Sequence, residues 1–355
     1  MIFLTPGPTK TQSNLSNWLN EAIQTNVVNL SHRTKWFEDI FGEVVSKLRL
    51  LLSIPNDYVI AFTSSATEVW ERSIQNLVVN ESFHIINGEF SQRHSNFSNK
   101  LGRKNIQMLV DVSFEGSLDQ FDIPSSCELI CLAQNETSTG MMFSAEEISN
   151  LRKKYPNQLI CVDIVSATPS LDLDYSSVDC AYFSVQKGFG LPAGLGVVIL
   201  SPNAISRAIT IKKKQSIGTY HSFLNLADHA TKNQTPETPN VLGIWLLNKT
   251  LDTYLAEGIQ NLRSRVYKQH HHLVTELSKI GFNSLVSSDK FQSRTVVAAT
   301  TPKSAKEIKI KLESLKVLVG GGYGKYSDSA IRIANFPMHT TAEHDELIKA
   351  LKQII

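Results

Sequence analysis

The sequence predicts an α/β fold in which a mostly parallel sheet is covered by helices on both faces and is joined to a smaller α+β domain. Short apolar runs alternate with helix-like segments from about residue 57, and the pattern changes after about residue 240. A chain of 355 residues, 42% of them hydrophobic, is long enough for one large core plus a smaller one. Strands interleaved with helices are typical of parallel sheets, because each helix returns the chain to the same edge.

Seven segments of the first 200 residues are rich in bulky and β-branched residues and predict the strands of this sheet: 58–63, 83–86, 106–110, 129–133, 159–164, 180–185 and 195–200. We expect 106–110, 129–133 and 159–164 to be buried. Helices are expected over 66–77, 90–101 and 144–154. The last begins at Ser144 with Glu147 three residues on, which predicts a capping box.

The C-terminal part predicts the smaller domain. It contains a helical stretch over 241–280 with Gly258 inside it, strands at 295–299, 317–319 and 330–334, and helices over 304–315 and from 341 to the end. We expect a large domain over 16–245 and a small α+β domain made of 1–15 and 246–355.

Composition excludes several classes of function. The formal net charge is +2, and the short run Lys212–Lys214 indicates a solvated face, so no nucleic-acid partner is expected. The four cysteines form no CxxC pair and are expected to be buried thiols, and the adjacent His270–His272 cannot all face one metal. No signal peptide and no run of 18 apolar residues occurs, so we expect a cytoplasmic protein without a membrane contact or a metal.

Lys187 is the candidate for covalent chemistry. The strand-like run 180–185 leads through Gln186 and Lys187 into the glycine-rich turn 188–194. A lysine at the carboxyl edge of a parallel sheet lies where open α/β folds bind ligands. Partial desolvation there lowers its pKa, so that it can attack an aldehyde. An ordinary surface lysine after a strand is the alternative.

Asp163 supplies the second half of the pattern. It ends the apolar run Leu159–Asp163, 24 residues before Lys187. A pyridine cofactor needs such a carboxylate, which keeps the ring nitrogen protonated and able to accept electrons from a substrate carbanion. A turn aspartate is the alternative for this residue alone. The order of the two residues is what indicates one class of enzyme.

With both residues in place, the sequence resembles the class V, fold-type I aminotransferases, and among them most closely the phosphoserine aminotransferases. The resemblance runs from Thr5 to the terminal helix and rests on these motifs in order: Ser31–Lys35, Gln134–Gly140, Asp163, Val185–Lys187 and Thr235–Pro239. It implies a sheet of the seven-stranded type in the large domain, pyridoxal 5'-phosphate as cofactor, and a homodimer with shared active sites.

The resemblance implies cofactor contacts residue by residue. Lys187 would carry the cofactor as a Schiff base and then move the substrate proton, and Asp163 would pair with the ring nitrogen. Phe90 would stack on the ring, with a core position on its helix as the alternative. Thr137 would place a hydroxyl near the ring oxygen. The helix start at Ala66 and Thr67 and the side-chain amide of Gln186 would bind the phosphate. Gln234 and Thr235 would come from the partner subunit.

The resemblance also implies substrate contacts. Arg332, in the strand 330–334, would hold the α-carboxylate with its guanidinium, with a structural salt bridge as the alternative. His32 and Arg33 would bind the phosphate of phosphoserine or the γ-carboxylate of glutamate, with surface charge before a helix as the alternative. The glycine-rich segment 320–324 is open to interpretation as a loop that gates the substrate.

Some residues depart from the phosphoserine enzymes. Those enzymes commonly have Arg at the Thr67 position and Trp at the Phe90 position, and their lysine is not usually followed by Gly188 and Phe189. The start Leu4–Thr9 looks more like that of alanine–glyoxylate or serine–glyoxylate enzymes of the same class. These changes leave the cofactor chemistry intact and bear on the substrate.

We therefore expect an enzyme that performs pyridoxal-phosphate-dependent transamination of amino and keto acids, with phosphoserine and 2-oxoglutarate in serine biosynthesis as the first hypothesis. An alanine– or serine–glyoxylate aminotransferase is the alternative within the class. A lyase of the cysteine desulfurase type needs a mobile reactive cysteine, and Cys127, Cys131, Cys161 and Cys180 lie in or beside probable strands. A non-catalytic binding protein on the same fold is the last alternative.

Overall fold

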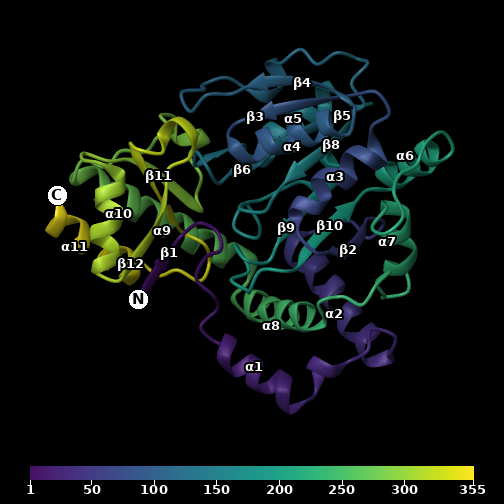
Figure 1. Ribbon diagram of the computed structural model, residues 1–355, viewed down its shortest axis with the longest axis horizontal. Coiled ribbons are helices and arrows are strands. Elements are labelled where there is room, and N and C mark those ends of the chain that lie inside the picture. Colours follow the sequence, from purple (N-terminus) through teal and green to yellow (C-terminus); the bar gives the residue numbers. More distant parts are fainter.

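The computed structural model describes all residues 1–355 and contains two main sheets (Figure 1). The larger sheet has seven strands in the order β2-β10-β9-β8-β5-β3-β4. These strands are β2 (Val59–Thr63), β3 (Glu81–Ile86), β4 (Lys104–Leu109), β5 (Leu129–Ala133), β8 (Leu159–Asp163), β9 (Cys180–Ser184) and β10 (Gly196–Leu200). Only β10 runs against its neighbours, so the expected mostly parallel sheet is confirmed.

The expected burial of β4 is wrong. Leu109 is 71% exposed, and Lys104 and Gln107 also face solvent. β4 pairs with β3 alone and therefore forms an edge of the sheet, whereas β3, β5, β9 and β10 are buried at every residue. A short apolar run cannot distinguish an edge from a central strand, because the pairing partners are distant in sequence.

Helices surround the larger sheet (Figure 1). They are α1 (Leu15–Gln24), α2 (Lys35–Leu52), α3 (Ala66–Leu77), α4 (Glu89–Lys100), α5 (Ala145–Lys154), α6 (Pro202–Lys212), α7 (Phe223–Ala230) and α8 (Val241–Glu257). α3 packs against both α4 and α6 and against β8, β9 and β10, while α2 packs along α8. Short elements lie in the connections: η1 (Val27–Asn29), η2 (Leu118–Gln120), η3 (Tyr175–Ser177), β6 (Asn135–Glu136) and β7 (Met141–Met142).

The second sheet joins the two ends of the chain in the order β1-β12-β13-β11. Its elements are β1 (Ile2–Leu4), α9 (Ile259–Lys279), η4 (Asp289–Phe291), β11 (Val296–Thr300), α10 (Ala305–Ser314), β12 (Val317–Gly321), η5 (Gly324–Tyr326), β13 (Ala330–Ala334) and α11 (Thr341–Ile354). β1 runs parallel to β12, so the N-terminus lies beside the C-terminal part (Figure 1). Gly258, with φ of 81°, separates α8 from α9, because a positive φ ends a helix.

Two hydrophobic cores accompany the two sheets. The larger contains 72 buried residues and includes the apolar side of α8, and the smaller contains 17. α9 belongs to both, since Leu262 and Val266 lie in the larger core and Leu273 and Leu277 in the smaller. The division into a large domain over 16–245 and a small domain of 1–15 and 246–355 remains a prediction.

The cysteines and the lysine run 212–214 lie as the composition predicted. All four cysteines are free and buried, and Lys212–Lys214 are exposed. None of the helices combines the length and the apolar character that crossing a membrane requires.

The start of α5 differs from the expected capping box. Ser144 accepts a hydrogen bond from the Glu147 N–H, as expected. The Glu147 carboxylate turns elsewhere: it accepts from the Leu118 N–H at 2.8 Å and the Ser117 hydroxyl at 3.0 Å, and it pairs with Lys290. These partners lie far away in sequence, so the local pattern could not reveal them. The buried carboxylate ties α5 to η2 and η4.

Replacing Glu147 with alanine should leave the buried Leu118 N–H without a partner. We expect the free energy of unfolding to fall by about 1–3 kcal/mol, the cost of an unsatisfied buried donor, measured by urea denaturation. The exposed neighbour Glu146, changed to alanine, is the matched control and should shift this free energy by less than about 0.5 kcal/mol. Equal effects of the two changes would contradict this account.

Candidate active site

A cavity of about 190 Å³ lies at the carboxyl edge of the larger sheet, where it meets the smaller one. Strands β2, β5, β8 and β9 run in the same direction, so the residues that follow them gather at this edge. The segments 6–8, before α1, and Tyr323, before β13, complete its wall. The sequence predicted a ligand site at the carboxyl ends of the strands, and this cavity lies there.

The cavity brings together most of the residues singled out from the sequence: Ala66, Thr67, Phe90, Thr137, Asp163, Gln186, Lys187 and Arg332. The other four do not line it: His32, Arg33, Gln234 and Thr235.

Lys187 lies just beyond β9 with its amine buried. Its Nζ donates a hydrogen bond to Thr137 Oγ1 at 2.6 Å and lies 5.0 Å from the centre of the Phe90 ring. Burial lowers the pKa of this amine to about 8, although the charges of Asp163 and Glu136 act in the opposite direction. A Lys187 with that pKa is partly neutral near neutral pH, which is the form that attacks an aldehyde.

Gly7 lies against the side chain of Lys187. A Cβ on Gly7 would lie 2.9 Å from Lys187 Cε. The N-terminal segment therefore covers the lysine side chain closely, and only a glycine allows that approach without a shift.

Asp163 ends β8 in the middle of this edge. The register places it between Ala133 of β5 and Tyr182 of β9. Its Oδ1 accepts a hydrogen bond from the Val165 N–H at 2.9 Å. Burial raises the pKa of this carboxyl to about 6, while that hydrogen bond and the charge of Lys187 act to lower it. A cationic N–H placed beside it would favour the ionised form further.

Thr137 is held by a chain of hydroxyl groups. Its hydroxyl donates to Ser166 Oγ at 3.0 Å, and the Ser166 hydroxyl donates to the Asn135 carbonyl at 2.6 Å. This chain fixes the oxygen that accepts from Lys187, so the position of the amine depends on residues of two different strand ends.

The start of α3 offers an anion site. Ser65 caps the helix by accepting from the Glu68 N–H, and the Ala66 N–H donates to Ser184 Oγ at 2.7 Å. Helix N-termini attract anions because their N–H groups and dipole point outwards. A Cβ on Gly196 of β10 would lie 2.6 Å from the Ser65 carbonyl carbon, so a glycine there lets the loop lie close to the sheet.

Arg332 reaches the cavity from β13 of the smaller sheet. Its Nε donates to the Gly321 carbonyl at 2.6 Å and its Nη1 to the Thr137 carbonyl at 3.1 Å, while its guanidinium carbon lies 4.4 Å from the centre of the Tyr323 ring. Arg332 forms no ion pair in the structure. Its guanidinium is thus oriented by backbone and ring contacts, and its Nη2 remains available for a ligand.

Several residues of the cavity wall were not predicted as site residues, among them Tyr323 and Trp70, and Glu136 supports the wall from behind. Tyr323 also meets the Phe90 ring edge-on at 5.9 Å, and the glycine-rich segment around it was the only signal. Trp70 follows Ala66 by one helical turn, and its buried Nε1–H has no partner. Glu136 is fully buried and accepts from the Ser91 N–H at 3.0 Å, which fixes the first turn of α4 and hence Phe90.

The four predicted residues outside the cavity form a group of their own, here called the outer group (His32, Arg33, Gln234 and Thr235). Arg33 Nη1 donates to Gln234 Oε1 at 3.0 Å, and the Thr235 hydroxyl donates to the Glu237 carbonyl at 2.7 Å. His32 is buried, and its Nε2 has no partner. Burial first, and the charge of Arg33 second, lower the pKa of His32.

These features fit one kind of molecule. A nucleophilic lysine, a buried carboxylate, an aromatic ring and a helix start around one cavity suit a planar pyridine aldehyde that carries a phosphate, which is pyridoxal 5'-phosphate. The site is that of a pyridoxal-phosphate-dependent enzyme.

Comparisons with known proteins agree. The family model described as Aminotransferase class-V matches residues 2–324, and the chain belongs to this family of pyridoxal-phosphate-dependent enzymes that transaminate. The chain is 27% identical to a phosphoserine aminotransferase of Nocardioides sp., over 98% of this chain and 94% of that one.

Solved structures extend the comparison. The phosphoserine aminotransferase SerC of Cytophaga hutchinsonii is 37% identical, with a TM-score of 0.95 over 100% of this chain and 99% of that one. An alanine–glyoxylate aminotransferase of Nostoc sp. is 21% identical, with a TM-score of 0.85 over 99% and 94%. The second likeness shows the shared fold. The predicted fold class, family, cofactor and enzymatic nature are thereby confirmed.

The lowered pKa of Lys187 predicts a pH dependence. Because only the neutral amine reacts, the rate at which the cofactor-free chain covalently captures pyridoxal phosphate should rise with pH and level off above about 8. Asp163→Asn removes a charge that raises the pKa of Lys187, so its midpoint should lie at lower pH. Stopped-flow absorbance over a pH series measures both midpoints. A wild-type midpoint near 10.5, the ordinary value for lysine, would contradict the burial argument.

Proposed function

We propose that this class V aminotransferase acts on phosphoserine, passing its amino group to 2-oxoglutarate in serine biosynthesis. The observation that carries the proposal is the exposed guanidinium of Arg33 in the outer group, which follows His32 in the chain and donates a hydrogen bond to Gln234. A phosphorylated or dicarboxylic substrate needs cationic partners for its second anionic group, and a neutral one does not. The phosphoserine aminotransferases of Nocardioides sp. and Cytophaga hutchinsonii, similar over nearly their whole length, support the same substrate.

Each residue of the cavity has a role in this proposal. Pyridoxal phosphate, when bound, supplies an electron sink for the carbanion at the substrate Cα. Asp163 would favour a protonated ring nitrogen, the start of α3 and Gln186 would bind the phosphate, and Phe90 would lie against the ring. The Lys187 amine takes the proton from the substrate Cα, a task suited to a group whose pKa is about 8. Arg332 orients the substrate α-carboxylate.

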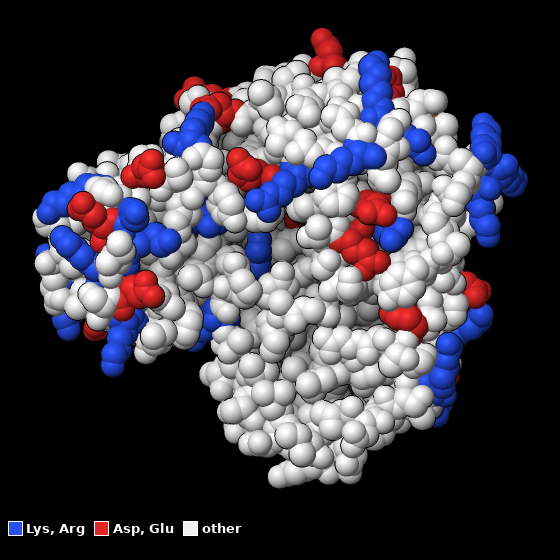
Figure 2. Space-filling view, in the orientation of Figure 1, with Lys and Arg blue, Asp and Glu red and all other residues white.

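We further propose a homodimer in which the outer group of one subunit completes the cavity of the other. Within one chain the outer group does not line the cavity. Near it, Ile23, Val28 and Trp36 are exposed apolar side chains. Figure 2 shows that the lower part of this face, over α1, carries few charged side chains, which suits burial against a second copy.

The second candidate is transamination of a small neutral amino acid with glyoxylate. Thr67 lies in the cavity where the phosphoserine enzymes commonly have Arg, so Arg332 is the sole arginine that this chain contributes to the wall. That observation favours a less anionic substrate. The cysteine desulfurase alternative has no such support, because none of the four buried cysteines lines the cavity. A cytoplasmic location stays a prediction.

Arg33→Ala separates the two candidates. If Arg33 binds the substrate phosphate, the KM for phosphoserine should rise roughly 10-fold or more, because a charge-assisted hydrogen bond contributes about 1.5–3 kcal/mol. The KM for alanine should change little. Steady-state kinetics with phosphoserine, glutamate, serine and alanine provide the measurement, with Lys35→Ala, an exposed neighbouring cation, as control. Turnover of alanine or serine with glyoxylate, without turnover of phosphoserine, would overturn the proposal.

Shared active sites predict complementation between two variants that are impaired with phosphoserine. Lys187→Ala and Arg33→Ala should each be impaired as homodimers with phosphoserine. A mixed dimer has one cavity with both changes and one with neither, so co-expression should restore activity through the unchanged cavity. The test is the activity of tandem-affinity-purified mixed dimers. If Arg33 served the cavity of its own chain, every cavity of the mixed dimer would be defective, and its KM for phosphoserine would stay as high as that of the Arg33→Ala homodimer.

A further inference from the structure

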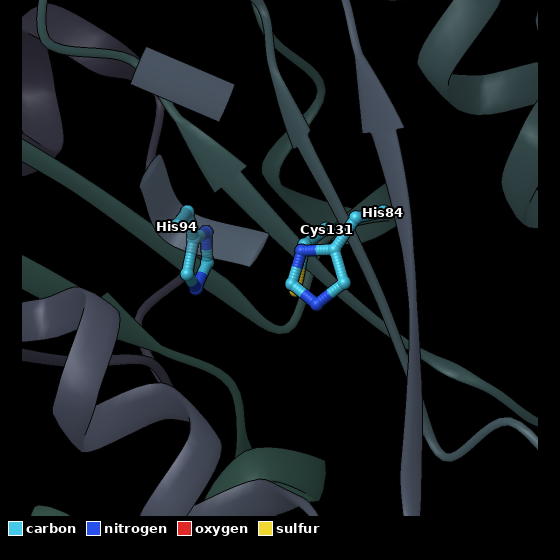
Figure 3. A group of neighbouring side chains, drawn as sticks. All are labelled: His84, His94 and Cys131. Atoms are coloured by element: carbon cyan, nitrogen blue, oxygen red, sulfur yellow. The ribbon is translucent and has the colours of Figure 1, made fainter. Parts of the chain in front are cut away.

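A second group of reactive side chains lies inside the larger sheet, beneath the cavity. His84, His94 and Cys131 are all buried, and one potential ligand atom of each lies within 4.8 Å of those of the other two (Figure 3). This group has no role in the proposed transamination. It is unusual because two imidazoles and a thiol are the donors that bind transition metals.

The fold brings these residues together from three elements. His84 of β3 and Cys131 of β5 are paired in register on neighbouring parallel strands, so their side chains project from the same face of the sheet. α4 packs against both β3 and β5 and contributes His94 to that face. The helix thus covers the strand pair, and the three side chains converge between them.

One nitrogen of the group lacks a partner. His84 Nε2 is within 2.8 Å of Ser82 Oγ, but its buried Nδ1 makes no hydrogen bond. Figure 3 shows the His84 ring with one edge turned towards His94. His94 is also buried and has a hydroxyl group beside each ring nitrogen, Ser73 Oγ at 3.1 Å from Nε2 and the Tyr182 hydroxyl at 3.4 Å from Nδ1. An ordinary hydrogen-bonded core would have paired His84 Nδ1 as well.

We propose that His84, His94 and Cys131 bind a thiophilic cation with a filled d shell, Zn²⁺ or Cu⁺. Soft thiolate with imidazole selects these ions over Mg²⁺ or Ca²⁺. Bonds of about 2.0 Å to nitrogen and 2.3 Å to sulfur place ligand atoms roughly 3.3–3.6 Å apart. Side-chain movements of about 1 Å would bring the three ligand atoms to this spacing. Cys161, paired in register with Cys131, is the neighbouring thiol that can serve as a fourth ligand for Zn²⁺.

The charge balance separates the two ions. Cu⁺ with the Cys131 thiolate is neutral, and Zn²⁺ needs the thiolates of both Cys131 and Cys161 to be neutral. A buried site favours an assembly close to neutral, because an uncompensated charge is costly there. Binding releases one proton from each thiol that becomes a ligand.

The site lies directly behind the cavity. His94 and Cys131 line a small void together with Phe90 and Asp163, which also line the cavity. A cation there stands close to the carboxylate that faces the ring nitrogen, on the side away from the cavity. We expect its binding to be measurable without any assay of transamination.

The experiment uses the purified holoenzyme in a His271→Gln/His272→Gln background, which removes two more accessible histidines of α9. After treatment with a chelator, the protein is dialysed against Zn²⁺ or, without oxygen, against Cu⁺, and the bound metal is measured by mass spectrometry. One cation per chain is expected, with a rise in Tm. Co²⁺ as a probe should give the absorbance of a thiolate–cobalt bond.

Variants assign the ligands. Cys131→Ser and His84→Gln should lose the stoichiometric metal and the thiolate–cobalt band, and Cys161→Ser should weaken Zn²⁺ but not Cu⁺. Cys127→Ser, a buried thiol outside the group, is the matched control and should bind as the parent does. If a variant fails to fold, the metal content of the parent protein still tests whether the site binds a cation. The absence of bound metal and of a thiolate–cobalt band in the parent would overturn the proposal, as would full retention of metal by Cys131→Ser.

Discussion

The desolvation of the Lys187 amine is the constraint on which the rest of the site depends. Burial takes the pKa of this amine from 10.5 to about 8. A shift of this size corresponds to about 3 kcal/mol of folding free energy lost below about pH 8, where the folded lysine, like the unfolded one, is mostly charged. The two hydrophobic cores have to support that cost. In return, the chain presents an amine whose neutral form is populated near neutral pH.

The neighbours of Lys187 show how the fold holds such an amine. Thr137 accepts its hydrogen bond, and Arg332 donates to the carbonyl of the same Thr137. Thr137 follows β5 of the larger sheet, and Arg332 lies on β13 of the smaller one. The position of the amine therefore depends on both sheets, and a change in how they pack would alter the cavity at its most sensitive point.

The groups for which we propose functions lie in three separate places in the fold. The outer group lies away from the cavity and is proposed to serve a second subunit. The cavity lies at the carboxyl edge of the strands. The group of His84, His94 and Cys131 lies beneath it, separated from Asp163 by a small void. The carboxyl edge of the sheet carries the cofactor site, while the outer group lies beside α2 and after α7 and the proposed cation ligands lie within β3, β5 and α4.

The sequence by itself predicted the seven strands of the larger sheet and the helices between 66 and 154, though not α1, α2, α6 or α7, and it identified Lys187 and Asp163, because apolar periodicity and the residues that end each strand are local properties. It also indicated Phe90, Thr137 and Arg332 through the resemblance to class V aminotransferases. Only the tertiary structure decided that β4 is an edge, that Glu147 turns to η2 instead of capping its helix, that Tyr323 and Trp70 line the cavity, and that His84 meets His94 and Cys131. Each of these facts depends on contacts between residues far apart in the chain, and a local pattern carries no information about which distant residue will be the partner.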